Sequence, residues 1–103
     1  MLLWMTMACG APDLEDAQLE AAEHYCDRAI ECDWIPVAQD DECIETMLPI
    51  FSLEWTDQNC EDNIDRNAWQ DCEDALAVMD CENEVWGINN IPGQCDETIL
   101  CSG

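Results

Sequence analysis

Nine cysteines in a chain of 103 residues restrict this protein to a small number of fold types. So high a cysteine content is typical of a disulfide-stapled domain or of a metal-cluster protein. Zinc ligands usually come as closely spaced Cys pairs, often with histidines. Here at least five residues separate any two successive cysteines from Cys26 onward, and His24 is the only histidine. The sequence therefore favours disulfides over zinc.

The surroundings of Cys9 set it apart from the other cysteines. An apolar run at residues 2–5 and the small Ala8 precede it, and Gly10 follows it. A secretory signal needs an apolar segment and a small residue before the cleavage site. In bacterial lipoproteins the cysteine directly after that site receives the lipid. We therefore expect Cys9 to be lipidated.

This assignment divides the chain into a signal peptide (1–8), a lipidated N-terminus with a short tether (9–12) and one domain (13–103). The leader is short, contains no Lys or Arg, and has Thr6 where lipoprotein signals more often have Leu. A chance Met-rich N-terminus with a stray cysteine is the alternative. The apolar run is far shorter than the ~20 residues that span a bilayer.

Lipidation of Cys9 would also make the number of remaining cysteines even, as expected of a secreted disulfide framework. Eight cysteines allow about a hundred pairings, among which sequence alone does not choose. The eight are Cys26, Cys32, Cys43, Cys60, Cys72, Cys81, Cys95 and Cys101.

The charge of the chain is extremely one-sided. There are 25 Asp and Glu residues against two arginines and no lysine, which gives a net charge of −23. Such a field repels nucleic acid and anionic lipid headgroups. We therefore expect no nucleic-acid partner, and membrane contact only through an acyl anchor.

Hydrophobic periodicity predicts an all-α domain of three to four short helices. Asp13 is the expected N-cap of a first helix over about 14–32. Asp40 and Asp41 are expected to open a second helix, and Pro49 to stop or kink it. A third is expected over about 68–80, behind a capping box of Asn67 and Gln70, and a final helical turn over 95–101.

Three stretches between these helices have other predictions. Residues 51–55 alternate apolar and polar side chains, which fits either an extended segment or a helix that resumes after Pro49. Residues 56–65 are expected to form a polar loop that holds Cys60, and residues 82–94 to form turns. Disulfides must then join the helices, because few apolar residues remain for a core.

Helix geometry restricts the pairing of Cys26 and Cys32. Six residues apart on one helix, they point about 120° away from each other. We therefore expect each to pair elsewhere. The equal spacing of Cys95 and Cys101 suggests an antiparallel pairing of the two segments.

The pattern resembles small cysteine-rich lipoproteins of myxobacteria and related bacteria. The residues that carry the resemblance are Tyr25-Cys26, Glu31-Cys32, Glu42-Cys43, Trp69-x2-Cys72-x8-Cys81, Pro92-x2-Cys95-Asp96 and the terminal Gly. It covers most of residues 24–103 together with the segment around Cys9. As a class those proteins have no assigned activity, so the resemblance implies a helical fold and an envelope location but no chemistry.

Calcium is the cofactor to which one stretch points. Oxygen-bearing side chains stand at alternate positions there, as in an EF-hand loop. Asp62 replaces the glycine needed at position six, and Ala68 replaces the glutamate at position twelve. A solvated acidic loop is the simpler interpretation, and weak Ca²⁺ binding is the alternative. The candidate ligands are Asp57, Asn59, Glu61, Asn63 and Asp65.

Catalytic machinery is not evident in the sequence. Neither serine, Ser52 nor Ser102, lies in a nucleophile elbow, and disulfides would leave no thiol for His24, which is interpreted as a plain helix residue. Four tryptophans, Trp34, Trp55, Trp69 and Trp86, offer a sugar platform, above all Trp55 and Trp86 in turn-rich stretches, but core packing is the expected use because tryptophan dominates small cores.

We therefore expect a lipid-anchored, acidic envelope protein that is structural or binds another envelope protein and is not an enzyme. A cation-binding surface protein is the second hypothesis, and a hydrolase that works through carboxylates is the third. Gly10 after the lipidated cysteine favours the outer membrane, because it is not the acidic residue that retains some lipoproteins in the inner membrane.

Overall fold

A computed structural model of the chain describes residues 12–82 and 91–102, and within these ranges it contains helices and no strand. The predicted all-α class is thereby confirmed. None of the helices in the described ranges is long and apolar enough to cross a membrane. The elements are α2 (Leu14–Glu31), η1 (Val37–Gln39), α3 (Asp40–Glu54), α4 (Asp57–Cys60), α5 (Arg66–Ala77), η3 (Gly93–Cys95) and α6 (Glu97–Leu100).

Helix α2 occupies the predicted range, and its buried face includes Ala22, Cys26 and Ala29. Hydrophobic periodicity also placed Leu19 on that face, but Leu19 is 40% exposed. Asp13 is its N-cap residue, but the aspartate side chain makes no capping hydrogen bond. The helix ends where Asp33 adopts a left-handed conformation with φ of 61°. The amide of Trp34 then donates to the carbonyl oxygen of Ala29 at 2.9 Å, which closes the end of the helix.

Helix α3 resolves the ambiguity after Pro49, because the helix runs through this proline to Glu54. Its buried residues Cys43, Met47 and Phe51 recur every four residues, the spacing of one helix face. In an extended segment Phe51, Leu53 and Trp55 would share one face. Instead Leu53 is 77% exposed while Phe51 is fully buried.

Three details differ from the prediction between residues 56 and 80. Residues 57–60 form the single turn α4 and not a loop. Helix α5 begins at Arg66 because Asp65, and not Asn67, is its N-cap: the Asp65 carboxylate accepts a hydrogen bond from the Ala68 amide at 2.9 Å. The helix also ends earlier than predicted, at Ala77.

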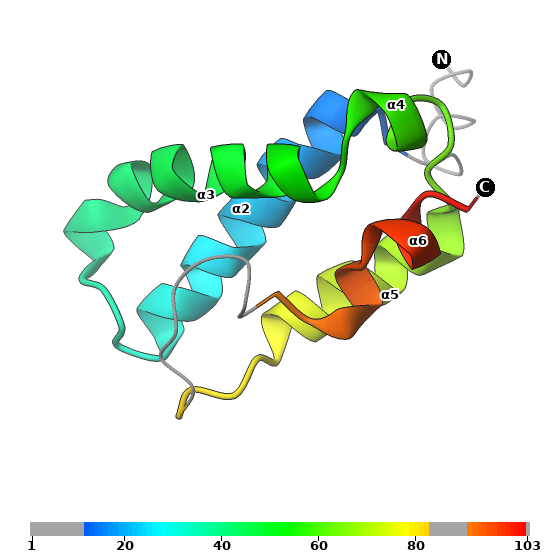
Figure 1. Ribbon diagram of the computed structural model, residues 1–103. Helices are drawn as coiled ribbons and strands as arrows, with labels where there is room; N and C mark the ends of the chain where they lie inside the picture. The colour runs from blue at the N-terminus through cyan, green and yellow to red at the C-terminus, as the bar shows by residue number, and fades with distance from the viewer. Residues whose placement is uncertain (1–11, 83–90, 103) are drawn as a thin grey trace, which may run out of the picture.

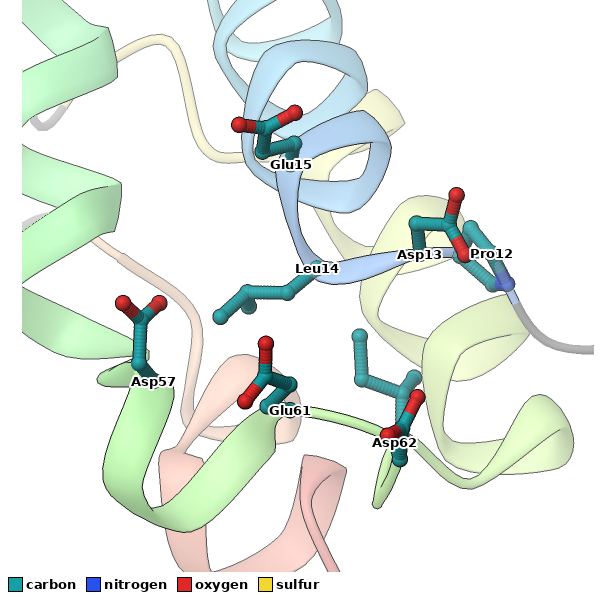
Figure 2. Close-up of a pocket in the computed structure, with 8 residues that line it drawn as sticks. Pro12, Asp13, Leu14, Glu15, Asp57, Glu61 and Asp62 are labelled. Carbon is teal, nitrogen blue, oxygen red and sulfur yellow. The ribbon is translucent and has the colours of Figure 1, made fainter.

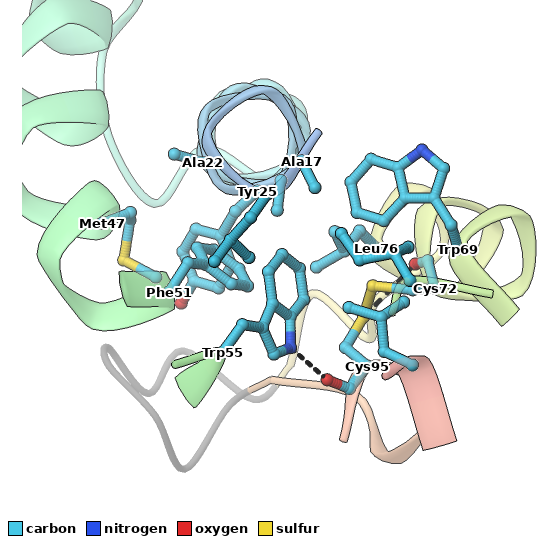
Figure 3. Packing of buried hydrophobic residues seen from close by; sticks show 14 of the residues in the cluster. Ala17, Ala22, Tyr25, Met47, Phe51, Trp55, Trp69, Cys72, Leu76 and Cys95 are labelled. Carbon is cyan, nitrogen blue, oxygen red and sulfur yellow. Dashed lines mark hydrogen bonds between the residues drawn. A yellow bond between two sulfur atoms is a disulfide. The ribbon is translucent and has the colours of Figure 1, made fainter. Parts of the chain in front are cut away.

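The core lies between the helices α2, α3 and α5. Helices α3 and α5 pack on either side of α2, and α6 lies beside α5 (Figure 1). Trp55, directly after α3, fills the space between them and faces Phe51 on one side and Leu76 on the other (Figure 3). Trp55 is fully buried, and its indole nitrogen donates to the carbonyl oxygen of Cys95 at 2.7 Å.

Four disulfides join these elements. The bond Cys26–Cys43 links α2 to α3, and Cys72–Cys95 links α5 to η3. The other two are Cys32–Cys81 and Cys60–Cys101. Cys26 and Cys32 pair elsewhere, as expected, but the predicted antiparallel pairing with Cys95 and Cys101 is wrong. Helix packing, and not equal spacing, decides which sulfur atoms meet.

The C-terminal segment follows the prediction where it is described. Asp96 caps the short helix α6, and its carboxylate accepts from the Thr98 amide at 2.8 Å. The predicted turns at residues 83–90, together with Trp86, lie outside the described residues. The same is true of the signal peptide and Cys9.

Candidate functional site

The five residues predicted to bind Ca²⁺ separate into two groups. Asp65 uses its carboxylate to cap α5. Asn59 donates to Glu97 at 3.3 Å, and Asn63 donates to the carbonyl oxygen of Asn59 at 3.2 Å. Only Asp57 and Glu61 line a hollow together. Calcium binding by this stretch stays a prediction, and the structure offers it two of the five side chains in one place.

That hollow, which we call the acidic hollow, has a volume of about 520 Å³ and lies between the start of α2 and the segment that follows α4 (Figure 2). The carboxylates of the hollow are exposed to water. A carboxyl group that acts as a catalytic acid is usually buried from water, and none of these is. The hollow therefore offers no support for carboxylate-pair hydrolysis. Its lining residues are Pro12, Asp13, Leu14, Glu15, Asp57, Glu61, Asp62 and Ile64.

A second cluster combines the single histidine with two glutamates. The Nε2 atom of His24 lies 2.8 Å from Oε2 of Glu73, so α2 and α5 are joined by an ion pair when the imidazole is protonated. Glu20 completes the group: the ligand atoms of all three side chains lie within 4.8 Å of one another. His24 is thus more than the plain helix residue that the sequence suggested.

The environment of Glu20 disfavours its charge. Burial from water is the main reason that the pKa of Glu20 is raised, and the negative charge and hydrogen bond of Glu73 raise it further. His24 acts in the opposite direction, because its positive form stabilises the carboxylate. A positive charge close to the two glutamates therefore favours the ionised form of Glu20.

A third group of carboxylates joins α4 to α6. Glu97 accepts hydrogen bonds from the amide of Thr56 at 2.9 Å and from its hydroxyl at 2.8 Å. These bonds lower the pKa of Glu97. The pKa of Glu54, by contrast, is raised, mainly by burial and further by the charges of Asp96 and Glu97.

Replacement of Glu54 by Gln is expected to stabilise the protein at about pH 7. Because the pKa of Glu54 is raised in the folded protein, its carboxyl group stays protonated to higher pH there than in the unfolded chain. Ionisation of Glu54 therefore lowers the free energy of unfolding as pH rises from its ordinary pKa of 4.5 through the folded value. Since the side chain is half-buried, solvent screening limits the gain to about 0.2–1 kcal/mol.

Thermal melts at about pH 7 and about pH 3 measure this gain, which should be absent at the lower pH because Glu54 is then protonated in both states. Glu45→Gln is the matched control, an exposed carboxylate on the same helix. An equal gain from Glu45→Gln would mean that net charge alone is responsible.

In the described part of the chain, Trp55 and Trp69 pack in the core, as expected, and do not form a sugar platform. Trp55 is fully buried and Trp69 is 6% exposed, and their rings meet edge to face with centroids 5.8 Å apart. Trp34 is half-buried and donates to the carbonyl oxygen of Cys81 at 2.8 Å. An exposed apolar patch at Trp55, which would have indicated a binding surface, is excluded.

Comparison with known proteins adds a family but no chemistry. The family described as "Family of unknown function (DUF6184)" matches residues 26–103. No curated protein and no solved structure matches the chain. The matched range contains all eight disulfide cysteines and Glu73, while Glu20 and His24 lie just before it.

Proposed function

The chain belongs to the family of unknown function DUF6184, and we propose that it is a lipid-anchored envelope protein that is structural or partner-binding and not catalytic. The small cysteine-rich lipoproteins of myxobacteria and related bacteria, which it resembles, are the class in which we place it. Gly10 after the lipidation site favours the outer membrane.

The observation that carries this proposal is the parity of the cysteines. Eight cysteines pair with one another in the described ranges, so Cys9 has no cysteine partner left within the chain. An unpaired cysteine in a disulfide-rich chain calls for a separate explanation. The apolar run before it and the small residues Ala8 and Gly10 on either side fit a lipidation site.

The distribution of the disulfides supports an oxidising compartment. Each helix from α2 to α5 carries a half-cystine or is directly followed by one, so the packing of this small core depends on bonds that the cytosol would reduce. In the envelope the same bonds persist. A secreted location therefore agrees with what the fold needs.

A binding or structural role is favoured over catalysis by the state of the nucleophiles. All eight cysteines from Cys26 to Cys101 are in disulfides, so none of them can serve as a thiolate beside His24. The carboxylates of the acidic hollow are exposed and hydrated. Therefore neither the disulfide-bonded cysteines nor the hydrated carboxylates are activated as nucleophiles in the way that hydrolases require.

A lipid on Cys9 would hold the acidic hollow near the bilayer. Gly10, Ala11 and Pro12 alone separate the anchor from Asp13, and the four steps from Cys9 to Asp13 span at most about 14 Å. Since Pro12 and Asp13 line the hollow, its carboxylates would lie close to the headgroups. Anionic headgroups would repel them, which leaves the acyl chains as the source of membrane affinity.

The intact mass of the unreduced protein from native membranes tests the proposal. We expect a chain that begins at Cys9, carries acyl chains and lacks eight hydrogens, because four disulfides are closed. We also expect Cys9→Ser to move the protein from the membrane fraction to the soluble fraction, since no other anchor is proposed. A mass that includes Met1 together with free thiols would contradict both the lipid anchor and the envelope location.

A further inference from the structure

We propose that Glu20, His24 and Glu73 bind one divalent transition-metal ion of the Zn²⁺ class. The site joins α2 to α5 and is separate from the acidic hollow and from the proposed lipid anchor. It would make the protein a metal-binding module of the envelope, whether or not Cys9 is lipidated.

The geometry of the three side chains fits a shared ion. Glu20 and His24 are four residues apart on α2, the spacing at which helical side chains face each other and at which zinc-binding helices place two ligands. Glu73 approaches from α5 and already lies 2.8 Å from Nε2 of His24. With all ligand atoms within 4.8 Å of one another, an ion about 2.0–2.2 Å from each needs only side-chain rotation.

The charges at the cluster call for a cation. The carboxylates of Glu20 and Glu73 lie together here, with ligand atoms within 4.8 Å of each other and of the imidazole, and two negative charges so close favour a bound cation. Arg28, one turn further along α2, is directed elsewhere: it donates to the carbonyl oxygen of Met79 and to Glu31. A divalent ion between the three side chains would neutralise the charges of both glutamates at once.

The helices that carry the ligands are held in place by the core. Tyr25, next to His24, and Cys72, next to Glu73, are fully buried. Cys32, directly after α2, is tied to Cys81, which follows α5, so a disulfide joins the two helices at this end. Ligands on rigid elements keep their geometry before the ion arrives, which favours binding.

The ligand set selects among metal ions. One imidazole nitrogen and two carboxylate oxygens suit Zn²⁺ and its first-row neighbours, whereas Ca²⁺ prefers six to eight oxygens. The side chain of His24 is 40% exposed and that of Glu73 is 19% exposed. Water can therefore complete the coordination shell, as in zinc sites with three protein ligands.

Calorimetric titration of the oxidised chain with ZnCl₂ at neutral pH tests the proposal. We expect one equivalent to bind and to raise the thermal midpoint. Loss of a residue that only hydrogen-bonds to a metal ligand weakens metal binding by about 10–100-fold. His24 and Glu73 are proposed as direct ligands, so His24→Gln and Glu73→Gln should each weaken Zn²⁺ binding by at least about tenfold. Circular dichroism verifies that each variant is folded. Glu23→Gln, an exposed neighbour on α2, is the matched control and should bind Zn²⁺ like the native chain.

A Ca²⁺ titration separates this site from general attraction of cations to a chain of charge −23. We expect His24→Gln to abolish the Zn²⁺ response and to leave any response to Ca²⁺ unchanged. Substitution with Co²⁺ should give visible absorption bands that disappear in His24→Gln. Equal Zn²⁺ binding by the native chain and His24→Gln, or no binding by the native chain, would overturn the proposal, while the test of the lipid anchor would stand unaffected.

Discussion

Reduction of the four disulfides is expected to unfold the protein at room temperature and neutral pH. In the chain-entropy model, loops that span 17 to 49 residues are each worth about 3–4 kcal/mol. A small domain has only about 5–15 kcal/mol of net stability in total. The charge of −23 opposes compaction as well, so the reduced chain lacks enough apolar burial to stay folded.

Far-UV circular dichroism and tryptophan fluorescence, recorded before and after addition of a phosphine reductant, measure this effect. We expect loss of helix together with exposure of Trp55 to water. High salt should restore part of the structure, because it screens the repulsion between carboxylates. Retention of native helix content by the fully reduced chain in low salt would contradict the expectation.

Two double variants separate loop entropy from core packing. Cys32→Ala with Cys81→Ala opens the largest loop, of 49 residues. Because Cys81 is exposed, little core packing is lost, and the free energy of unfolding should fall by about 4 kcal/mol, the entropic value. Cys26→Ala with Cys43→Ala opens a loop of 17 residues, worth about 3 kcal/mol, but also removes buried sulfur atoms from the core. The second variant should therefore cost more than its loop length predicts.

Local sequence signals were sufficient for the long helices. The first helix was predicted within one residue of its observed end, because its alanines and Cys26 repeat on one face. Near Pro49 the local signals left two alternatives open, and near Asp65 they indicated the wrong cap, Asn67. The structure shows that burial of Phe51 continues the helix through the proline, and that Asp65, four residues before Trp69, provides the cap.

The disulfide pairing depends on tertiary packing that the spacing of cysteines does not contain. Cys72 meets Cys95 because η3 packs along α5, although the two cysteines are 23 residues apart in the chain. Equal spacing of two cysteine pairs was therefore a misleading signal.

The candidate metal site was half visible in the sequence. Glu20 and His24 have the spacing of ligands on one helix, but that spacing is common on solvated helices. Glu73 lies 49 residues from His24, and only the packing of α5 on α2 brings the two together. The EF-hand-like pattern at residues 57–65 was the more conspicuous signal, although α4 and the α5 cap disperse its side chains.

Replacement of Trp55 by Ala is expected to lower the free energy of unfolding by about 3–5 kcal/mol, the range for a large buried aromatic residue. Trp55 is fully buried, and its ring lies 5.0 Å from that of Phe51 and 5.8 Å from that of Trp69. The substitution would leave a cavity between α3 and α5 (Figure 3). It would also leave the buried carbonyl oxygen of Cys95 without its indole donor.

Trp55→Phe separates the hydrogen bond from most of the packing, and we expect it to cost about 1–3 kcal/mol because the carbonyl oxygen of Cys95 loses its donor. Trp69→Phe is the matched control, since the indole nitrogen of Trp69 points away from the cluster (Figure 3). Urea unfolding of the oxidised proteins, followed by far-UV circular dichroism, measures both. If Trp55→Phe were no more destabilising than Trp69→Phe, the bond to Cys95 would not contribute to stability, and Trp55 would act through ring packing alone.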